Sequence, residues 1–235
     1  MPGYYPVMLD VRERLVIVIG GDRVAAEKAA ALAASGARVR VISPEFAVEM
    51  QALAAQAQVE LCDKQYMPGD LEGAFVVVAS TTDKQLIEAI WQETQQRGQP
   101  LNIVDVPRYC SFILPSVLRR GKLTVTVSTE GASPSLARRI RQQLEETFTP
   151  AYETFIDLAA QVRTHLRRAG ISYEARDAFF GAFMASPILS LLESGETERA
   201  LEVAVELLSA YGVEVEAVHL ASELIQGEEY ATFKL

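Results

Sequence analysis

The sequence predicts an α/β protein in which a doubly wound parallel sheet is followed by a small hairpin-plus-helix region and a helical carboxyl-terminal region. Three observations predict this class. An apolar run at residues 15–19 leads through two glycines into a helical pattern. Strand and helix patterns then alternate through the first hundred residues, as in parallel sheets with right-handed crossovers. From about residue 150 onward, apolar side chains recur at helical spacing.

The first half of the chain is divided by its glycines, prolines and capping residues. Gly36 is placed to end the first helix, and Ser43 with Pro44 breaks the second strand. Thr82 or Asp83 can cap the helix that ends at Gly98. The predicted strands are residues 16–19, 39–42, 59–62, 75–79 and 101–104, and the first two predicted helices are residues 24–35 and 47–55.

Beyond Asp105 the pattern changes to a hairpin and then to helices. Residues 112–118 and 123–128 flank a short basic turn, and Ser133 with Pro134 starts a helix that runs to residue 147. The next helix carries an apolar face of Phe155, Leu158, Ala159, Val162 and Leu166. Further helices are predicted at residues 174–185, 188–193, 197–210 and 215–225, before a poorly ordered tail at residues 226–235. The expected domains are residues 1–112, 113–148 and 149–235.

The composition predicts a globular protein with a sizeable core, because 49% of the 235 residues are hydrophobic. No apolar run reaches the ~18 residues of a membrane span and the amino terminus lacks a signal-peptide layout, so a cytoplasmic location is expected. The formal charge of −9 argues against a nucleic-acid partner. Cys62 and Cys110 form no C-x-x-C pair and are expected to be small buried side chains. No metal site is predicted, since His165 and His219 are the only histidines.

The glycine turn after the first strand matches in part the fingerprint of a Rossmann-type dinucleotide site. Gly20 and Ala25 fill its first and last positions, but Asp22 stands where a glycine would let the backbone approach a pyrophosphate. A like charge there predicts weak binding, although Arg23 could neutralise it. A doubly wound sheet that binds no nucleotide is the alternative interpretation.

Polar residues after the second and fourth strands extend this candidate site. Glu45 can accept the ribose 2′-hydroxyl, and no arginine follows at once to hold a 2′-phosphate, so the pattern favours NAD over NADP. Ser80 and Thr81 can contact the ribose or the nicotinamide, but helix capping is a simpler explanation of that segment.

Asp105 and a group of basic residues are the candidates for substrate chemistry. Asp105 follows the predicted fifth strand, at the edge where open α/β sheets bind ligands. It can be a general base, coordinate a metal, or cap the next turn. Between Asp105 and Glu145 the only acidic residue is Glu130, which suits either a polycarboxylate ligand or a solvated surface. The basic residues in this interval are Arg108, Arg119, Arg120, Lys122, Arg138, Arg139 and Arg141.

Several segments, taken together and in order, carry a family resemblance over residues 5–145. They are Tyr5-Pro6-Val7, the loop from Gly20 to Lys28, Asn102-Ile103-Val104-Asp105, Ser111-Phe112-Ile113-Leu114-Pro115-Ser116, and the stretch from Ser128 to Arg138. This set resembles precorrin-2 dehydrogenase, the siroheme-synthase N-terminal type, a family that includes dehydrogenases and dehydrogenase/ferrochelatases. Asp22 departs from the third glycine of the family loop, and no motif covers the helices beyond residue 150.

The resemblance implies NAD-dependent oxidation of precorrin-2, a tetrapyrrole with eight carboxylates, to sirohydrochlorin on the way to siroheme or cobalamin. It implies that Asp105 is catalytic and that the hairpin and the helix after it form a homodimer. The expected NAD-binding residues are Gly20, Gly21, Asp22, Arg23, Val24, Ser43, Pro44, Glu45, Ser80 and Thr81. The expected substrate-binding residues are Asn102, Arg108, Ser111, Arg119, Arg120, Lys122, Thr129 and Arg138.

Three hypotheses therefore stand side by side. The leading one is an NAD-dependent precorrin-2 dehydrogenase with Asp105 as the base. The second adds or substitutes ferrochelation of sirohydrochlorin, in which Asp105 would accept the pyrrole protons. The third is a nucleotide- or tetrapyrrole-binding module without catalytic activity, which the unusual Asp22 favours.

Overall fold

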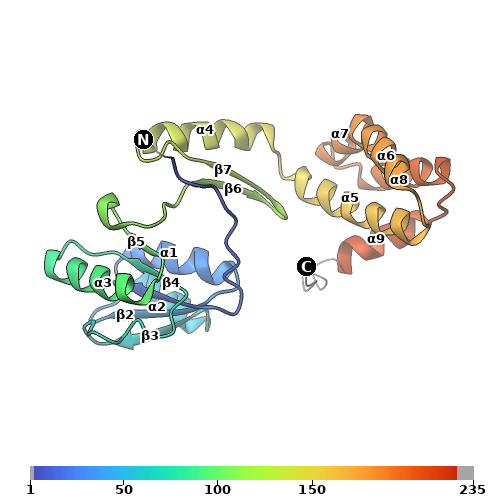
Figure 1. Ribbon diagram of the computed structural model, residues 1–235. Coiled ribbons are helices and arrows are strands. Elements are labelled where there is room, and N and C mark those ends of the chain that lie inside the picture. Colours follow the sequence, from blue (N-terminus) through green and yellow to red (C-terminus); the bar gives the residue numbers. More distant parts are fainter. Residues whose placement is uncertain (1–2, 227–235) are drawn as a thin grey trace. The chain divides into compact units, whose positions relative to one another are not determined.

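The computed structural model describes residues 3–226, and the chain divides into two units between Leu114 and Pro115 (Figure 1). The first unit holds a parallel sheet with its helices, and the second holds a hairpin and the remaining helices. This division lies close to the expected boundary at residue 112. The further boundary expected at residue 148 stays a prediction.

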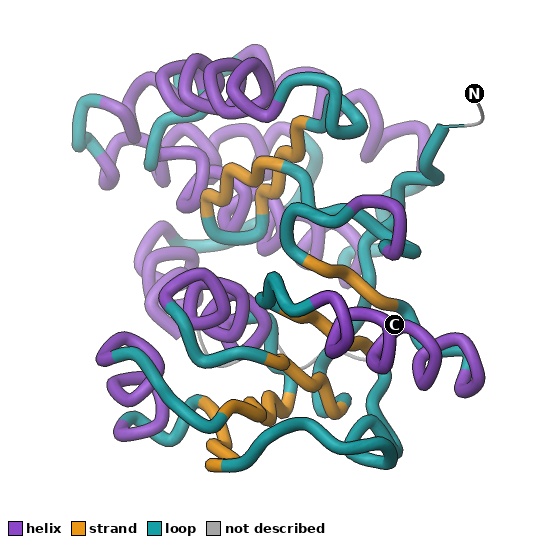
Figure 2. Tube along the Cα trace, turned by 90° about the vertical axis from the view of Figure 1, so that its left-hand side faces the viewer, coloured by secondary structure: helices purple, strands orange, loops and turns teal. Residues whose placement is uncertain are grey.

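Five parallel strands form the sheet of the first unit, in the order β3-β2-β1-β4-β5. Helices follow β1, β2 and β4 and cover both faces of the sheet (Figure 2). The predicted Rossmann-type α/β fold is confirmed. Its elements are β1 (Leu15–Ile19), α1 (Arg23–Ala34), β2 (Arg38–Ser43), α2 (Val48–Ala55), β3 (Val59–Asp63), β4 (Val76–Ala79), α3 (Lys84–Arg97), β5 (Leu101–Ile103) and a 3-10 turn, η1 (Pro107–Tyr109).

The central strand β1 is apolar on both sides because each side faces a different core. Val16 and Val18 pack into the cluster that contains Ala25 and Ala29 of α1. Their neighbours Ile17 and Ile19 pack into the opposite cluster with α3. Side chains of a strand alternate between the two faces, so an unbroken apolar run is what a strand covered on both faces requires.

Some strand ends differ by a few residues from the expected ones. The fourth strand begins at Val76 rather than at residue 75, and Phe75 packs under the guanidinium of Arg14, 4.0 Å from the ring centre. The hairpin strand expected from residue 112 begins at Ser116. Phe112 instead packs into the core of the first unit, and its carbonyl accepts a hydrogen bond from Asn102 Nδ2 at 3.0 Å.

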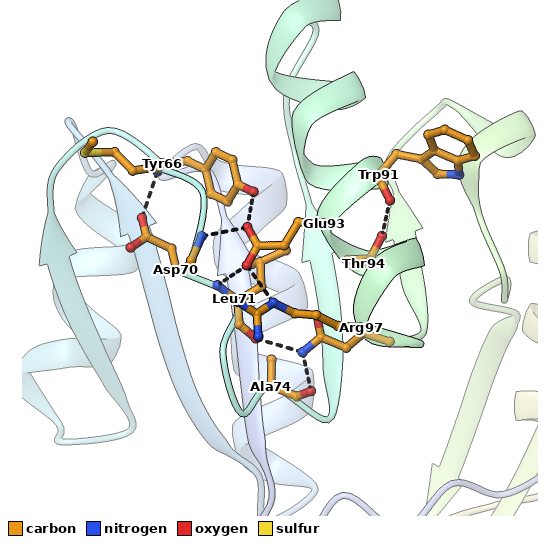
Figure 3. Close-up of polar contacts among 11 residues, drawn as sticks. Tyr66, Asp70, Leu71, Ala74, Trp91, Glu93, Thr94 and Arg97 are labelled. Atoms are coloured by element: carbon orange, nitrogen blue, oxygen red, sulfur yellow. Dashed lines mark hydrogen bonds and ion pairs between the residues drawn. The ribbon is translucent and has the colours of Figure 1, made fainter.

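Glu93 on α3 anchors the long loop between β3 and β4 (Figure 3). Its buried carboxylate accepts hydrogen bonds from the Tyr66 hydroxyl at 2.5 Å, the Gly69 amide at 3.0 Å and the Leu71 amide at 3.3 Å. Arg97 Nε donates to it at 2.9 Å. Burial raises the pKa of Glu93, but the hydrogen bonds outweigh burial and hold the pKa below its ordinary value. Burial and the bond to Glu93 raise the pKa of Tyr66.

The second unit opens with the antiparallel hairpin of β6 (Ser116–Arg120) and β7 (Leu123–Val127). Leu118 points into the unit and is 2% exposed, whereas its neighbour Val117 is 40% exposed on the other face. The helix α4 (Pro134–Thr147) contacts both strands, and Ser133 caps it as expected by accepting the Leu136 amide at 3.3 Å.

The remaining helices share one core, built partly from the apolar face expected on α5. Phe155, Leu158, Val162 and Leu166 are buried there, and Ala159 packs partly buried against them. The helices are α5 (Ala151–Arg168), α6 (Tyr173–Ala185), α7 (Ile188–Glu193), α8 (Thr197–Ala210) and α9 (Ala217–Gln226). The last helix therefore includes Gln226, which was expected in the tail, and residues 227–235 lie outside the described residues.

Candidate nucleotide and catalytic site

The candidate cofactor residues gather at the carboxyl edge of the sheet, where the strand order reverses. Gly20 follows β1 directly and Ser80 follows β4, and these two strands are hydrogen-bonded neighbours. On the other side of β1, Ser43 ends β2. Ligands of open α/β sheets bind at such a reversal, so the topology brings the expected nucleotide residues to the expected place.

Both glycines of the loop are required by contacts within the protein. Gly20 has a φ of +115°, and a Cβ on it would lie 2.4 Å from the backbone oxygen of Ser80. A Cβ on Gly21 would lie 1.9 Å from the backbone oxygen of Glu45. Any side chain at either position would therefore displace a neighbouring loop of the site.

Asp22 is the amino-terminal cap of α1. Its Oδ1 accepts a hydrogen bond from the Ala25 amide at 2.7 Å, and its two oxygens lie 3.1 and 2.9 Å from the donating hydroxyl of Ser80. Arg23, which could neutralise Asp22, has its Nε 3.5 Å from Glu27 Oε1. Asp22 thus occupies donors that a phosphate could use, and Ser80 is committed to it.

The residues after Asp22 still fit the pyrophosphate of a dinucleotide. Among the described residues, the backbone amides of Arg23 and Val24 have no hydrogen-bond partner, as expected in the first turn of a helix. Both residues are exposed. Free amides at a helix amino terminus bind phosphate oxygens, aided by the helix dipole.

The other expected cofactor residues are divided between the surface and the loop interior. Pro44 and Glu45 are exposed after β2, whereas Ser43 is 8% exposed and donates to the backbone oxygen of Glu45 at 2.7 Å. Thr81 Oγ1 accepts the Asp83 amide at 3.2 Å. Asp83, one of the two candidates, is the cap of α3.

Asp105 is exposed on a tight turn just beyond β5. Its φ is +59°, a left-handed conformation that few residues other than glycine adopt, although aspartate tolerates it better than most. The Val106 amide closes the turn by donating to the Ile103 oxygen at 3.2 Å. Among the described residues no partner binds the Asp105 carboxylate, which is therefore available to a substrate.

Asn102 and Ser111, expected to contact substrate, make internal contacts. Asn102 is 8% exposed, and its amide nitrogen donates to the Phe112 carbonyl. Ser111 Oγ accepts the Leu101 amide at 2.8 Å. A role in substrate binding stays a prediction for both, but their hydrogen bonds already hold the chain after the Asp105 turn against β5.

The basic residues differ in what they contact. Arg120 Nε donates to the carbonyl of Phe148 at 2.9 Å, and Lys122 Nζ lies 2.8 Å from Asp157 Oδ1. Arg141 pairs with Glu145. The side chains of Arg119, Arg138 and Arg139 are exposed and make no hydrogen bond or ion pair among residues 3–226. The guanidinium of Arg108 lies over the Tyr109 ring at 4.8 Å.

Thr129 and Cys110 have structural contacts that the sequence did not indicate. Thr129 Oγ1 accepts the Ser133 amide at 3.0 Å and shapes the turn before α4. Cys110, expected to be a buried apolar residue like Cys62, is only partly buried and its sulfur bonds to the Asp105 turn. In the sequence, the feature that could have indicated this role of Cys110 was its position between the two most specific motifs of the resemblance, Asn102-Ile103-Val104-Asp105 and Ser111-Phe112-Ile113-Leu114-Pro115-Ser116.

Two negative observations concern the part of the chain that the structure describes. No group of three or more His, Cys, Asp or Glu side chains is arranged there to hold a metal ion. No helix within that part is long and apolar enough to cross a membrane.

Two protein-family models match successive segments of this chain. Residues 7–116 match a family model described as "Putative NAD(P)-binding", and residues 120–147 match one described as "Sirohaem biosynthesis protein central". A solved structure titled "SirC, precorrin-2 dehydrogenase" superposes with a TM-score of 0.72 at 23% identity, covering 86% of this chain and 98% of that chain. That likeness shows a shared fold.

Curated relatives carry the name siroheme synthase. The protein of Nitrosomonas eutropha is 33% identical over 207 residues, which are 88% of this chain and 44% of the relative. That of Pseudomonas aeruginosa PAO1 is 34% identical over 202 residues, or 85% and 43% of the two chains. This chain spans less than half the length of these relatives. The two family matches and these relatives together show that the chain belongs to the siroheme synthase family and contains a domain that matches the NAD(P)-binding model.

Proposed function

We propose that this chain oxidises precorrin-2 to sirohydrochlorin with NAD as the electron acceptor. The observation that carries the proposal is Asp105, an exposed carboxylate on a left-handed turn at the ligand-binding edge of an NAD(P)-binding sheet. Side chains held in sparsely populated backbone conformations cluster at active sites. The family and the solved precorrin-2 dehydrogenase of the same fold support this substrate.

The reaction removes two hydrogens from the macrocycle. A hydride goes to the nicotinamide of NAD⁺, which is the chemistry that the cofactor supplies when bound, and one proton is released. Asp105 is the base that takes this proton or orients the ring that loses it. The free amides of Arg23 and Val24 would hold the pyrophosphate at α1.

The test is NADH formation by the purified protein with precorrin-2 and NAD⁺, followed by absorbance. We expect turnover in the wild type and a loss of at least about a hundredfold in kcat for Asp105→Asn, the usual contribution of a positioned acid or base. Binding of NAD should be unchanged in the variant. Wild-type turnover by the variant would remove Asp105 from the mechanism, and an inactive wild type that binds ligand would favour a binding module.

The preference for NAD, the assembly and the location belong to the same proposal. Glu45 is exposed after β2 and would repel a 2′-phosphate, so the assay should give a higher kcat/KM with NAD than with NADP. A homodimer is supported by exposed apolar side chains on the hairpin and α4. The two free cysteines suit a reducing, cytoplasmic setting.

A further inference from the structure

The thiol of Cys110 connects both ends of the turn that carries Asp105. Its sulfur accepts the Ile103 amide at 3.1 Å, and the S–H lies within reach of the Ile103 and Val106 oxygens at 3.3 and 3.5 Å. The thiol has one hydrogen, so it can donate a hydrogen bond to only one of these two carbonyl oxygens at a time. Ile103 and Val106 are the first and last residues of the turn.

The position of Cys110 is itself determined by contacts on either side. Its amide donates to the Pro107 oxygen at 3.0 Å, closing η1. Tyr109, the residue before it, packs against Trp91 with ring centres 5.7 Å apart, and its hydroxyl donates to Glu88 Oε2 at 2.9 Å. Tyr109 therefore attaches this segment to α3, which holds the Cys110 sulfur within hydrogen-bond distance of the turn.

These contacts complete the outer edge of the sheet. The neighbouring strand β4 bonds to one side of β5, and the amides of Leu101 and Ile103 point to the other. Ser111 Oγ accepts a hydrogen bond from the Leu101 amide, and Cys110 Sγ accepts one from the Ile103 amide. Without these partners the two amides would hydrogen-bond to water. The turn that carries Asp105 would keep the bond from the Val106 amide to the Ile103 oxygen but would lose its contacts with the thiol.

We propose that Cys110 is a positioning residue for Asp105 and acts on the reaction only through that carboxylate. The proposal rests on the function proposed above. The cysteine does not touch the substrate; it keeps Asp105 in the left-handed conformation that directs its carboxylate outward. Loss of the sulfur lets the turn relax to a commoner backbone conformation, with the carboxylate displaced from the reacting ring.

The test compares Cys110→Ala, Cys110→Ser and Cys62→Ala in the NADH assay, with thermal unfolding of each. Serine retains a donor and an acceptor, and Cys62 is a partly buried cysteine whose thiol makes no hydrogen bond among the described residues. We expect Cys110→Ala to lower kcat at least tenfold with KM for NAD unchanged. Cys110→Ser should recover most of that loss, and Cys62→Ala should retain wild-type kcat. Cys110→Val, which fills the space without a polar atom, replaces the alanine variant if that variant does not fold.

A double variant separates positioning from a general structural effect. Because Cys110 acts through Asp105, Cys110→Ala with Asp105→Asn should be no slower than Asp105→Asn alone. Wild-type kcat in Cys110→Ala, or losses that multiply in the double variant, would overturn the positioning role while leaving the dehydrogenase in place. An inactive wild type, or a fully active Asp105→Asn, would overturn the proposed function and the positioning role with it.

Discussion

Asp22 has two opposed roles at the start of α1. Its carboxylate stabilises the helix by accepting the Ala25 amide, and through Ser80 it joins the ends of β1 and β4. The same negative charge lies beside the free amides that a pyrophosphate would use. Asp22 therefore stabilises the fold but is expected to weaken the binding of NAD.

We predict that Asp22→Gly binds NAD several-fold more tightly, and about tenfold if ~1.4 kcal/mol of repulsion is relieved. The variant should also lose a few tenths of a kcal/mol of stability, because glycine is a weaker cap. Asp22→Asn is the matched control, since it retains the capping oxygen without the charge. Calorimetry measures both affinities. Equal or weaker binding in both variants would show that the charge does not oppose the phosphates.

Glu93 gives a pH-dependent contribution to stability. Its pKa is lower in the folded protein than in the unfolded chain, so the stabilisation is present above the unfolded pKa and is lost as pH falls through the folded pKa. We predict that Glu93→Gln lowers the free energy of unfolding by about 1–3 kcal/mol at pH 7, because glutamine removes the charge and replaces one of the two acceptor oxygens with an NH2 group that faces other donors. The difference from wild type should shrink below about pH 4.5.

Chemical denaturation at pH 7 and at pH 3.5 to 4.5 measures this difference. Glu88→Gln is a suitable control, because Glu88 lies on the same helix but accepts its hydrogen bonds from Tyr109 and Gln92, outside the Glu93 network. A Glu93→Gln deficit that stays constant with pH would contradict the assignment.

Among the elements of the second unit, two basic residues connect the hairpin to the end of α4 and to α5. Arg120 donates to the carbonyl that ends α4, and Lys122 pairs with Asp157 on α5. A side chain on Gly121, at the tip, would lie 2.6 Å from Glu153 Cγ. The predicted group of substrate-binding cations therefore contains structural members as well as exposed ones.

This distinction changes the expected effects of substitution. Arg119→Gln with Arg138→Gln should raise KM for precorrin-2, since several arginines can act together on a polycarboxylate although each exposed pair is worth only ~0–1 kcal/mol. KM for NAD should be nearly unchanged. Arg120→Gln should instead lower stability by about 1 kcal/mol through its lost bond to Phe148. Steady-state kinetics and thermal unfolding on the same samples distinguish the substrate-binding arginines from the structural one. Equal increases in KM for precorrin-2 and KM for NAD would contradict the role of Arg119 and Arg138 in substrate binding.

For the whole molecule, we predict a homodimer. A two-stranded hairpin has two open edges, and its outer face exposes Val117 at 40% of its surface, while Leu136 on α4 is 49% exposed. Light scattering at micromolar concentration should give twice the chain mass. Val117→Lys should shift the mass toward the monomer, and Val218→Lys, at a valine 75% exposed on α9, should not. A monomeric wild type would contradict the prediction.

Most helices and strands, and their order, could be predicted from the sequence. The apolar run of β1, the Ser133-Pro134 start of α4 and the left-handed Gly98 at the end of α3 all act within a few residues, so local pattern was enough. The edge at which Asp105 and the glycine loop lie also followed, because parallel strands share one carboxyl edge.

The hydrogen-bond partners of the polar groups could not be predicted, because they depend on how the chain packs in three dimensions. Asp22 meets Ser80 across 58 positions of sequence, Arg120 meets Phe148 across 28, and Glu93 meets Tyr66 across 27. A hydrogen bond depends on distances of a few tenths of an ångström between groups that topology brings together. Residue type and spacing carry no such information. Tertiary packing alone therefore made Cys110 a partner of the Asp105 turn, where composition indicated only a small apolar side chain.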